Sequence, residues 1–406
     1  MSDHREPFGE HTRAVHGPEL PPFTQRPLGL PVIRSATFAF PSAQEYADVL
    51  AGSADGYCYS RVDNPTSDAF AQAVAALEAV GVDGEVIGQP FASGMAAISA
   101  VLMAFSSAGS HVVVPRQVYG GTYGLLTQVL ARFGVQASFV DGADLTAVRA
   151  AIRPNTTLVW AETLANPTLA VADLPGLAAI AREAGAVLAV DSTFASPAVC
   201  RPLTFGVDLV VHSATKFIGG HSDATGGVVV GRPELLAGVR NVRIDLGGAL
   251  APDEAFLLHR GLQTLPLRVV RQCEAAQFIA AKLADHPMLE RVDYPGLPGH
   301  PDHALAMRLF QPGRFGAVVS ITPRGGYAAG MALCDRLRLV AVATSLGGVH
   351  SLASHVASTT HRQLSAQALM QAGIPAGMVR ISCGLEDPED LLADITGALD
   401  RLGNVP

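Results

Sequence analysis

The stretch TLVWAETLANPTLAVADLPGLAAIAREAGAVLAVD, residues 157–191, shows the local pattern that decides the fold. It contains an apolar run at 157–162, a helical pattern at 174–185 and a second apolar run at 186–191. Nearly continuous apolar strands that alternate with a helix of this length predict a crossover between parallel strands, buried on both faces.

The same alternation extends in both directions, from about residue 84 to residue 231. It predicts an α/β fold in which helices cover both faces of a mainly parallel sheet. The further strand patterns lie near 84–88 and at 111–115, 136–140, 208–213 and 225–231, and the further helical patterns lie at 94–105 and 121–133.

The pattern along the chain predicts three parts. Residues 1–65 are rich in proline, glycine and aromatic residues without clear periodicity, which is typical of an extended arm. Residues 66–262 form the predicted large domain, and residues 263–406 form a smaller C-terminal α+β domain. The elements expected at and beyond this second boundary are a helical stretch at 252–285, strands at 316–323 and 378–384, and helices near 328–337 and 389–402.

Composition excludes several classes of protein. The net charge is −8 and no run of basic residues occurs, which argues against a nucleic-acid partner. No stretch of about 18 apolar residues is long enough to span a membrane, and the charged N-terminus lacks the apolar stretch of a signal peptide. Five widely spaced cysteines without a C-x-x-C pair favour the reducing cytoplasm over a disulfide framework or a metal site.

Polar side chains and glycines follow several of the predicted strands. In an open α/β sheet, ligands bind beyond the carboxyl ends of the strands, so we expect these residues to converge on one crevice. The set comprises Ser93, Gly94, Met95, Tyr119, Asn166, Asp191, Thr193, Ser213, Thr215 and Lys216.

The chemistry of this set suits pyridoxal 5'-phosphate (PLP). The amides of Gly94 and Met95, at a predicted helix N-terminus, form an anion site. The ring of Tyr119 can stack on a flat ligand. Lys216 can form a Schiff base, and Asp191 can pair with a pyridinium nitrogen.

Simpler interpretations exist for single members of the set. Ser93 is equally suited to a plain helix cap, and Asp191 to a turn cap. Of the 28 lysines and arginines only Lys216 and Lys282 are lysines, so lysine chemistry has two candidates. Lys282 lies in an amphipathic helical pattern and is expected to be solvated, whereas Lys216 lies between hydroxyl residues and a Gly-Gly pair.

Several motifs resemble those of the PLP enzymes of cysteine and methionine metabolism, the cystathionine γ-synthase and γ-lyase group. The resemblance covers nearly the whole chain, and the motifs taken together are highly specific. They are YSRVDNPT (59–66), ASGMAA (92–97), VYGGTY (118–123), AVDSTF (189–194), HSATKFIGGHSDATGG (212–227), YPGLPGHP (294–301), SLGG (345–348) and VRISCGLED (379–387).

The resemblance implies PLP fold type I, which is aspartate aminotransferase-like, and it assigns roles to the matching residues. Lys216 would carry the cofactor, Asp191 would pair with its ring nitrogen, and Tyr119 would stack on the ring and act as acid or base. Further cofactor contacts would come from Gly94, Met95, Thr193, Ser213 and Thr215, and the α-carboxylate of an amino-acid substrate would bind Asn166, Ser345 and Arg380. A structural ion pair with an acid such as Glu386 is the alternative for Arg380.

The resemblance also implies an assembly. Tyr59 and Arg61, in the predicted arm, would reach the cofactor phosphate of a neighbouring subunit. A dimer would then be the smallest catalytic unit, and two such dimers would form a homotetramer.

The implied function is that of a PLP-dependent carbon–sulfur lyase of the cystathionine γ-lyase or methionine γ-lyase type. Such an enzyme acts by γ-elimination and releases a 2-oxo acid, ammonia and a thiol. The alternative is γ-replacement, as in a cystathionine γ-synthase or an O-acylhomoserine sulfhydrylase, because the shared motifs serve steps that both reactions have in common.

Four residues depart from the family pattern. Thr344 replaces a glutamate of cystathionine-handling members, and Gly121 replaces a cysteine of the best-known methionine γ-lyases. Asp63 replaces a glycine, and His350 replaces a glutamate. The stretch STTHRQLS (358–365) looks more like the homoserine sulfhydrylases. We expect Thr344 and His350 to contact the substrate, with a solvated loop histidine as the alternative for His350.

Other classes of protein find little support. His300 and His303 have the spacing of a metal site, but no glutamate lies nearby to act as the base of a metal-dependent hydrolase. Ser93 lacks the first glycine of a serine-hydrolase motif. A non-catalytic PLP-fold regulator would have lost the lysine or gained a DNA-binding module.

Overall fold

The structure, a computed structural model, describes residues 15, 25, 27–362 and 365–404. The chain divides into two compact units, residues 1–31 and residues 32–406, and both sheets lie in the second unit. The beginning of the predicted arm, including the N-terminus considered for a signal peptide, lies largely outside the described residues. No helix among the described residues is long and apolar enough to cross a membrane.

A seven-stranded sheet lies at the centre of residues 32–406, in the order β1-β7-β6-β5-β4-β2-β3. The five strands from β6 to β3 in this order run parallel, and β7 is antiparallel to both of its neighbours. This confirms the predicted α/β class with a mainly parallel sheet. The bounds are β1 (Ile87–Phe91), β2 (His111–Pro115), β3 (Gln136–Val140), β4 (Thr156–Glu162), β5 (Val187–Asp191), β6 (Leu209–Ser213) and β7 (Gly227–Gly231).

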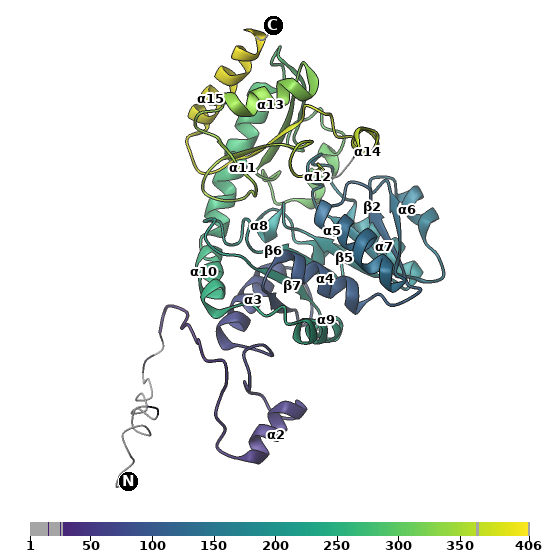
Figure 1. Cartoon of the computed structure of the whole chain (residues 1–406), viewed down its shortest axis with the longest axis vertical. Coiled ribbons are helices and arrows are strands. Elements are labelled where there is room, and N and C mark those ends of the chain that lie inside the picture. The colour runs from purple at the N-terminus through teal and green to yellow at the C-terminus, as the bar shows by residue number, and fades with distance from the viewer. Residues whose placement is uncertain (1–14, 16–24, 26, 363–364, 405–406) are drawn as a thin grey trace. The chain divides into compact units, whose positions relative to one another are not determined.

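Helices cover both faces of this sheet (Figure 1). Along β4, Leu158 and Trp160 pack in one core cluster with residues of α4 and α9, while Val159 and Ala161 pack in the other with residues of α3 and α7. Strands buried on both faces explain why the apolar runs in the sequence are nearly continuous. The helices of this part are α2 (Ala43–Ala51), α3 (Pro65–Glu78), α4 (Gly94–Ala104), α5 (Gly120–Gly124), α6 (Leu145–Ala151), α7 (Leu174–Ala184), α8 (Ser196–Val199), α9 (Pro233–Leu246) and α10 (Pro252–Leu262).

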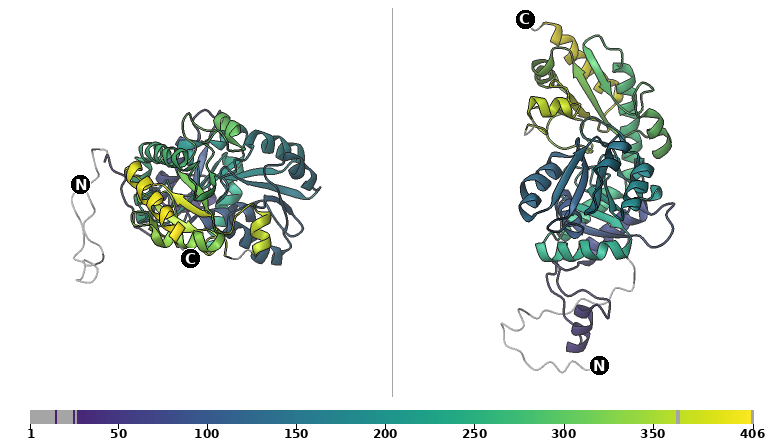
Figure 2. Two further views of the ribbon diagram at one scale, coloured as in Figure 1. Left: turned by 90° about the horizontal axis from the view of Figure 1, so that it is seen from above. Right: turned by 90° about the vertical axis from the view of Figure 1, so that its right-hand side faces the viewer.

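A second sheet of five strands follows, in the order β10-β11-β12-β9-β8. Figure 2 shows it in green to yellow, beside the blue and teal elements of the larger sheet. Strands β9 and β12 and helices α13 and α15 lie where the sequence predicts them, and β8, β10 and β11 are additional. The bounds are α11 (Leu265–Leu283), β8 (Leu289–Asp293), α12 (His303–Leu309), β9 (Val318–Pro323), α13 (Gly326–Arg336), β10 (Ala341–Val342), β11 (Leu352–His355), α14 (Ala366–Gln371), β12 (Val379–Ser382) and α15 (Pro388–Asp400).

Two long helical predictions are interrupted in the structure. The stretch 252–285 forms α10 and α11, which are separated at Gln263 and Thr264, and Pro266 lies in the first turn of α11. The stretch 121–133 forms only the short helix α5, followed by a π-helical turn at Leu125–Val129 and a 3₁₀ turn. Departures of this kind from the regular α-helix are frequent at functional sites.

The motif at 59–66 determines how α3 begins. Asn64 is the N-cap, and its side-chain oxygen accepts the N–H of Thr66 at 2.9 Å while Pro65 occupies the first helical position. The preceding residue, Asp63, forms ion pairs with Arg240 and with the buried Arg243, whose Nη2 lies 2.7 Å from Asp63 Oδ1. The departure from the family's glycine at position 63 therefore connects this motif to α9.

This contact yields a prediction about stability. Asp63→Ala removes the ion-pair partner of the Arg243 guanidinium, which is only 2% exposed. We expect a loss of about 2–3 kcal/mol of unfolding free energy, because breaking a buried ion pair strands a charge. Urea denaturation followed by circular dichroism measures the effect. Glu183→Ala, which removes the exposed ion pair with Arg149, is the control and should leave the midpoint nearly unchanged. Equal shifts in both variants would contradict the prediction.

Candidate active site

A cavity of about 900 Å³ lies at the carboxyl ends of β4, β5 and β6. Its wall also includes the N-terminal ends of α4 and α5 and residues from the loops of the C-terminal part. Thirteen of the residues selected from the sequence line it, which brings the strand ends together as expected. These residues are Ser93, Gly94, Met95, Tyr119, Asn166, Asp191, Thr193, Ser213, Thr215, Lys216, Thr344, Ser345 and Arg380.

The N-terminus of α4 offers an anion site. The Ser93 hydroxyl caps the helix by accepting the N–H of Ala96 at 3.1 Å, so the simpler interpretation of Ser93 holds, and the adjacent Gly94 and Met95 line the cavity. A Cβ at Gly94 would lie 2.6 Å from Ser213 Cβ. This close approach requires glycine and brings the helix N-terminus against the end of β6. Such a terminus favours a phosphate group.

Asp191 ends β5 at the floor of the cavity. Its Oδ1 accepts the backbone N–H of Thr193 at 2.9 Å, so the residue does form the turn considered as its alternative. The Thr193 hydroxyl in turn accepts the N–H of Ser213 at 2.8 Å. Burial raises the pKa of Asp191, and a cation in the cavity would favour its ionised form. A pyridinium nitrogen is such a cation.

Lys216 reaches the cavity from the loop after β6. Its Nζ donates to Ser345 Oγ at 2.6 Å. Burial, together with the positive charge of Arg380, lowers the pKa of Lys216 to about 8. Lys282, by contrast, is exposed on α11 with its Nζ 6.0 Å from the centre of the Phe278 ring. The structure therefore places Lys216 in the cavity and Lys282 on the surface, as the sequence suggests.

The loop that carries Lys216 is supported by a residue that the sequence analysis missed. The guanidinium of Arg268, on α11, donates to the carbonyl oxygens of Phe217 and Ile218 at 2.9 and 3.2 Å. A Cβ at Gly220, whose φ is 72°, would lie 2.0 Å from Arg268 Nη1. Gly220, the second glycine of the pair, therefore makes room for this arginine.

Arg380 is a buried cation on β12. Its Nη1 donates to Asn166 Oδ1 and its Nη2 to the carbonyl oxygen of Ser345, both at 2.9 Å. The alternative ion pair with Glu386 is wrong, since the Glu386 carboxylate instead accepts the N–H and the hydroxyl of Ser351. Arg380 has no carboxylate partner among the described residues, and burial lowers its pKa to about 10. A substrate carboxylate would balance its charge.

Three selected residues do not line the cavity of this chain. Tyr59 is half-exposed and stacks with Arg61, whose Nη1 donates to the carbonyl oxygen of Ile244 at 2.7 Å. His350 is exposed and lies outside the lining. His300 and His303, considered for a metal site, bond instead to backbone groups of Asp302 and Pro295. The described residues contain no cluster of three potential metal ligands.

Several further lining residues were not selected from the sequence, among them Glu162, Phe194, Thr360 and Arg362. Glu162 is the last residue of β4 and was assigned to the strand only, although the rule of strand ends applies to it as well. The Arg380 guanidinium lies over the Phe194 ring, with Arg380 Cζ 5.8 Å from the ring centre. Thr360 and Arg362 come from the stretch 358–365. Neither periodicity nor strand ends place the residues of such a loop.

The cofactor expectation has a steric consequence at Gly94. Gly94→Ala would force its methyl group against Ser213, and overpacking of this kind costs about 1–3 kcal/mol. We expect PLP affinity to fall about tenfold or more, measured by fluorescence titration of the apoenzyme. Gly124→Ala is the matched control, because Gly124 lines the same cavity and a Cβ there meets nothing within 4 Å. Unchanged affinity in Gly94→Ala would argue against phosphate binding at α4.

Comparisons with known proteins agree with this geometry. The chain is 42% identical to an L-methionine gamma-lyase of Pseudomonas deceptionensis, over 99% of this chain and 100% of the relative. It is also 42% identical to a cystathionine gamma-synthase of Mycobacterium bovis, over 98% of each. A crystal structure from Campylobacter jejuni that contains a pyridoxyl-lysine-phosphate group matches with a TM-score of 0.89 and 33% identity, over 97% of this chain and 100% of that chain.

The family model for Cys/Met metabolism PLP-dependent enzymes matches residues 11–400. This match confirms the fold type and the cofactor that the motifs imply. The chain therefore belongs to the family of PLP-dependent enzymes of cysteine and methionine metabolism.

Proposed function

We propose that this protein is a carbon–sulfur lyase that acts on a sulfur-containing amino acid by γ-elimination and releases a 2-oxo acid, ammonia and a thiol. One observation carries the proposal: Lys216 Nζ donates to Ser345 Oγ in a cavity that the N-terminal residues of α4 and the buried Arg380 also line. An amino acid bound through its carboxylate at Arg380 would present its α-carbon to this amine. The likeness to methionine γ-lyases supports the same reaction.

The residues of the chain divide the work as follows. PLP, when bound, stabilises the negative charge that develops on the substrate carbon. Gly94, Met95, Ser213 and Thr215 would hold its phosphate and Asp191 its ring nitrogen, with Tyr119 against the ring. Lys216 would attach the cofactor.

Lys216 would also move protons. Because its pKa is lowered to about 8, a useful fraction of the amine is neutral near neutral pH and can accept the proton of the substrate α-carbon. An arginine at this position would stay protonated. Arg380 and Asn166 would hold the α-carboxylate, which fixes the orientation of the α-carbon toward this base.

The charges at the cavity mouth bear on the choice of substrate. Thr344 and Arg362 are exposed there, whereas the lining carboxylates, Glu162 and Asp191, end strands at the cavity floor. A substrate with a distal ammonium group, such as cystathionine, would find no carboxylate at the mouth among the described lining residues. A thioether such as methionine needs none.

The second candidate function is γ-replacement, and the 42% identity to a cystathionine γ-synthase favours it. Gly121 is a further reason to consider it. A Cβ at this position would lie 2.6 Å from the Tyr119 ring and 2.7 Å from Met95 Sδ, so a cysteine there would displace its neighbours. The substrate-facing surface of this chain therefore differs from that of a lyase with cysteine at this position.

We further propose that the chain works as a homotetramer of two dimers in the cytoplasm. The half-exposed Tyr59 and the exposed Arg61, outside the cavity of their own chain, support a role in a neighbouring subunit. The five free cysteines support a reducing compartment. The two sheets support a division into an arm (1–65), a large domain (66–262) and a small domain (263–406).

A substrate panel tests the reaction. The holoenzyme is given methionine, cystathionine, cysteine and O-acylhomoserine, each with and without a thiol, and 2-oxo acid and thioether products are quantified. We expect a 2-oxo acid and a thiol to form when methionine is supplied without an added thiol. Lys216→Ala should lose at least about 10²-fold in rate, since a general base contributes 10²–10⁴-fold, while Lys282→Ala keeps its activity. Thioether formation without 2-oxo acid would support the replacement reaction instead.

Mixing of inactive variants tests the assembly. Arg61→Ala and Lys216→Ala subunits are unfolded together, refolded and assayed. If Arg61 serves a neighbour's site, mixed dimers contain one intact site, and activity should return. Refolding Asp191→Asn with Lys216→Ala is the control. Both residues line the cavity of one chain, so each site of a mixed dimer lacks one of them and no activity should return. No recovery with Arg61→Ala, or recovery only in the control, would contradict a shared site.

A further inference from the structure

Glu162 connects the walls of the active-site cavity. It ends β4 and pairs in parallel register with Asp191, which ends β5. Its Oε1 accepts the backbone N–H of Tyr119 at 2.6 Å, and its Oε2 accepts that of Asn166 at 3.5 Å. One carboxyl group therefore contacts both the segment that presents the Tyr119 ring and the segment that presents the carboxylate-binding Asn166.

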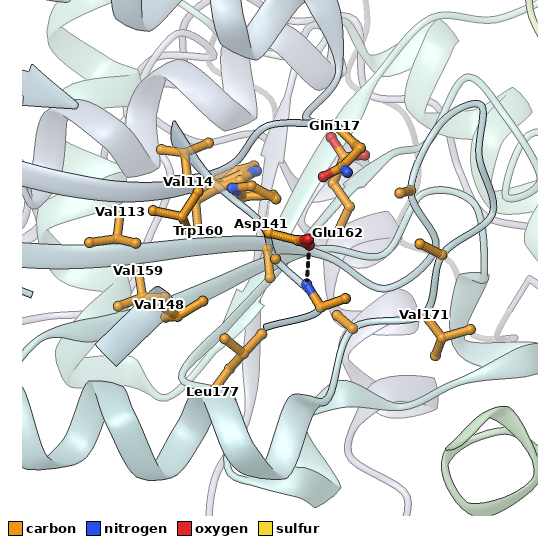
Figure 3. Close-up of a pocket in the computed structure, with 18 residues that line it drawn as sticks. Val113, Val114, Gln117, Asp141, Val148, Val159, Trp160, Glu162, Val171 and Leu177 are labelled. Carbon is orange, nitrogen blue, oxygen red and sulfur yellow. Dashed lines mark hydrogen bonds between the residues drawn. The ribbon is translucent and has the colours of Figure 1, made fainter. Parts of the chain in front are cut away.

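The surroundings of Glu162 are largely apolar. The residue is only 7% exposed, and it lines a second, small cavity of about 50 Å³ as well as the active-site cavity. Figure 3 shows Glu162 at this small cavity together with Val113, Val159 and Leu177. No lysine, arginine or histidine side chain bonds to its carboxyl group within the described part of the chain.

The charged groups around Glu162 decide its protonation. Asp191 faces it from β5, Asp141 lines the small cavity, and Lys216 and Arg380 line the large one. Two adjacent carboxyl groups in such a setting cannot both ionise without a large cost. Burial, and then the negative charge of Asp191, raises the pKa of Glu162 to about 8.

The cofactor decides which of the two carboxyl groups holds the proton. Asp191 is the one assigned to the positively charged ring nitrogen, and that contact favours its ionised form. A single shared proton is then held by Glu162. Because a protonated carboxyl group keeps a carbonyl oxygen, it can still accept the N–H of Tyr119.

We propose that Glu162 is a positioning residue that stays protonated in the working enzyme, holds Tyr119 and Asn166 in place, and leaves Asp191 as the only ionised carboxyl group at the cavity floor. The proposal rests on the proposed PLP chemistry for the role of Asp191. The contacts of Glu162 itself are independent of the substrate.

Two substitutions separate positioning from charge. Glu162→Gln keeps a neutral side chain with an acceptor oxygen, so kcat/KM at neutral pH should stay within about threefold of the unchanged enzyme. Glu162→Ala leaves the Tyr119 N–H without its acceptor, and we expect a loss of about 10–100-fold, mainly in kcat. If Glu162→Gln loses as much as Glu162→Ala, an ionised Glu162 is required and the proposal is wrong.

Infrared difference spectroscopy of the holoenzyme tests the proton directly. The carbonyl stretch of a protonated carboxylic acid should be present at neutral pH, absent in Glu162→Gln and unchanged in the control Glu386→Gln. This readout needs no turnover. If no substrate of the panel reacts, the proposed function is wrong. The carbonyl band still reports, independently of that result, whether Glu162 is protonated. Without the band at neutral pH, the proposal is overturned.

The pH dependence of stability provides a third measurement. Between about pH 4.5 and pH 8 the folded protein would retain a proton on Glu162 that the unfolded chain releases. Unfolding therefore becomes easier as the pH rises through this window, and Glu162→Gln lacks this contribution. We expect the thermal midpoint of the unchanged holoenzyme to fall relative to that of Glu162→Gln as the pH increases. Parallel midpoints across the window would contradict a protonated Glu162.

Discussion

The site depends on one buried cation. Arg380 extends from β12 of the smaller sheet to Asn166, which follows β4 of the larger sheet, and to the backbone of Ser345. A buried guanidinium is costly unless its N–H groups are bonded and its charge is matched. Its bonds hold the two sheets together around the cavity. Ser345 has a φ of 84°, unusual for a residue other than glycine, and its hydroxyl receives Lys216 Nζ.

Much of this arrangement could be predicted because it follows from local rules. Buried strands produce nearly continuous apolar runs, so six strands of the larger sheet lie close to where the sequence predicts them. The first is the exception: the prediction near 84–88 is three residues too early, because β1 spans Ile87–Phe91. The convergence of strand ends then brings Asp191, Ser213 and Lys216 together without any knowledge of their side-chain contacts. The long-range partner of Lys216, Ser345, came only from the motif SLGG, because no local pattern relates residues so far apart in sequence.

The rest depends on tertiary contacts. The edge strands β8 and β10 and the inner strand β11 are short or partly polar, so their hydrophobic pattern in the sequence is weak. The break of 121–133 into α5 and two irregular turns reflects its position on the cavity wall, not its helical propensity. Glu162 was overlooked because a single acidic residue at a strand end does not reveal its pairing with Asp191. The roles proposed for Tyr59 and Arg61 would involve a second chain, which no single-chain pattern describes.

The scarcity of lysine has a practical consequence. With two lysines in the chain, one exposed on α11 and the other within the active-site cavity, the surface offers a single lysine amine to acylating reagents among the described residues. A dye, a spin label or a solid support would attach to the chain at Lys282, with the α-amino group as the competing amine. Selective conjugation of an enzyme usually requires an engineered cysteine, and here the natural composition offers a lysine handle.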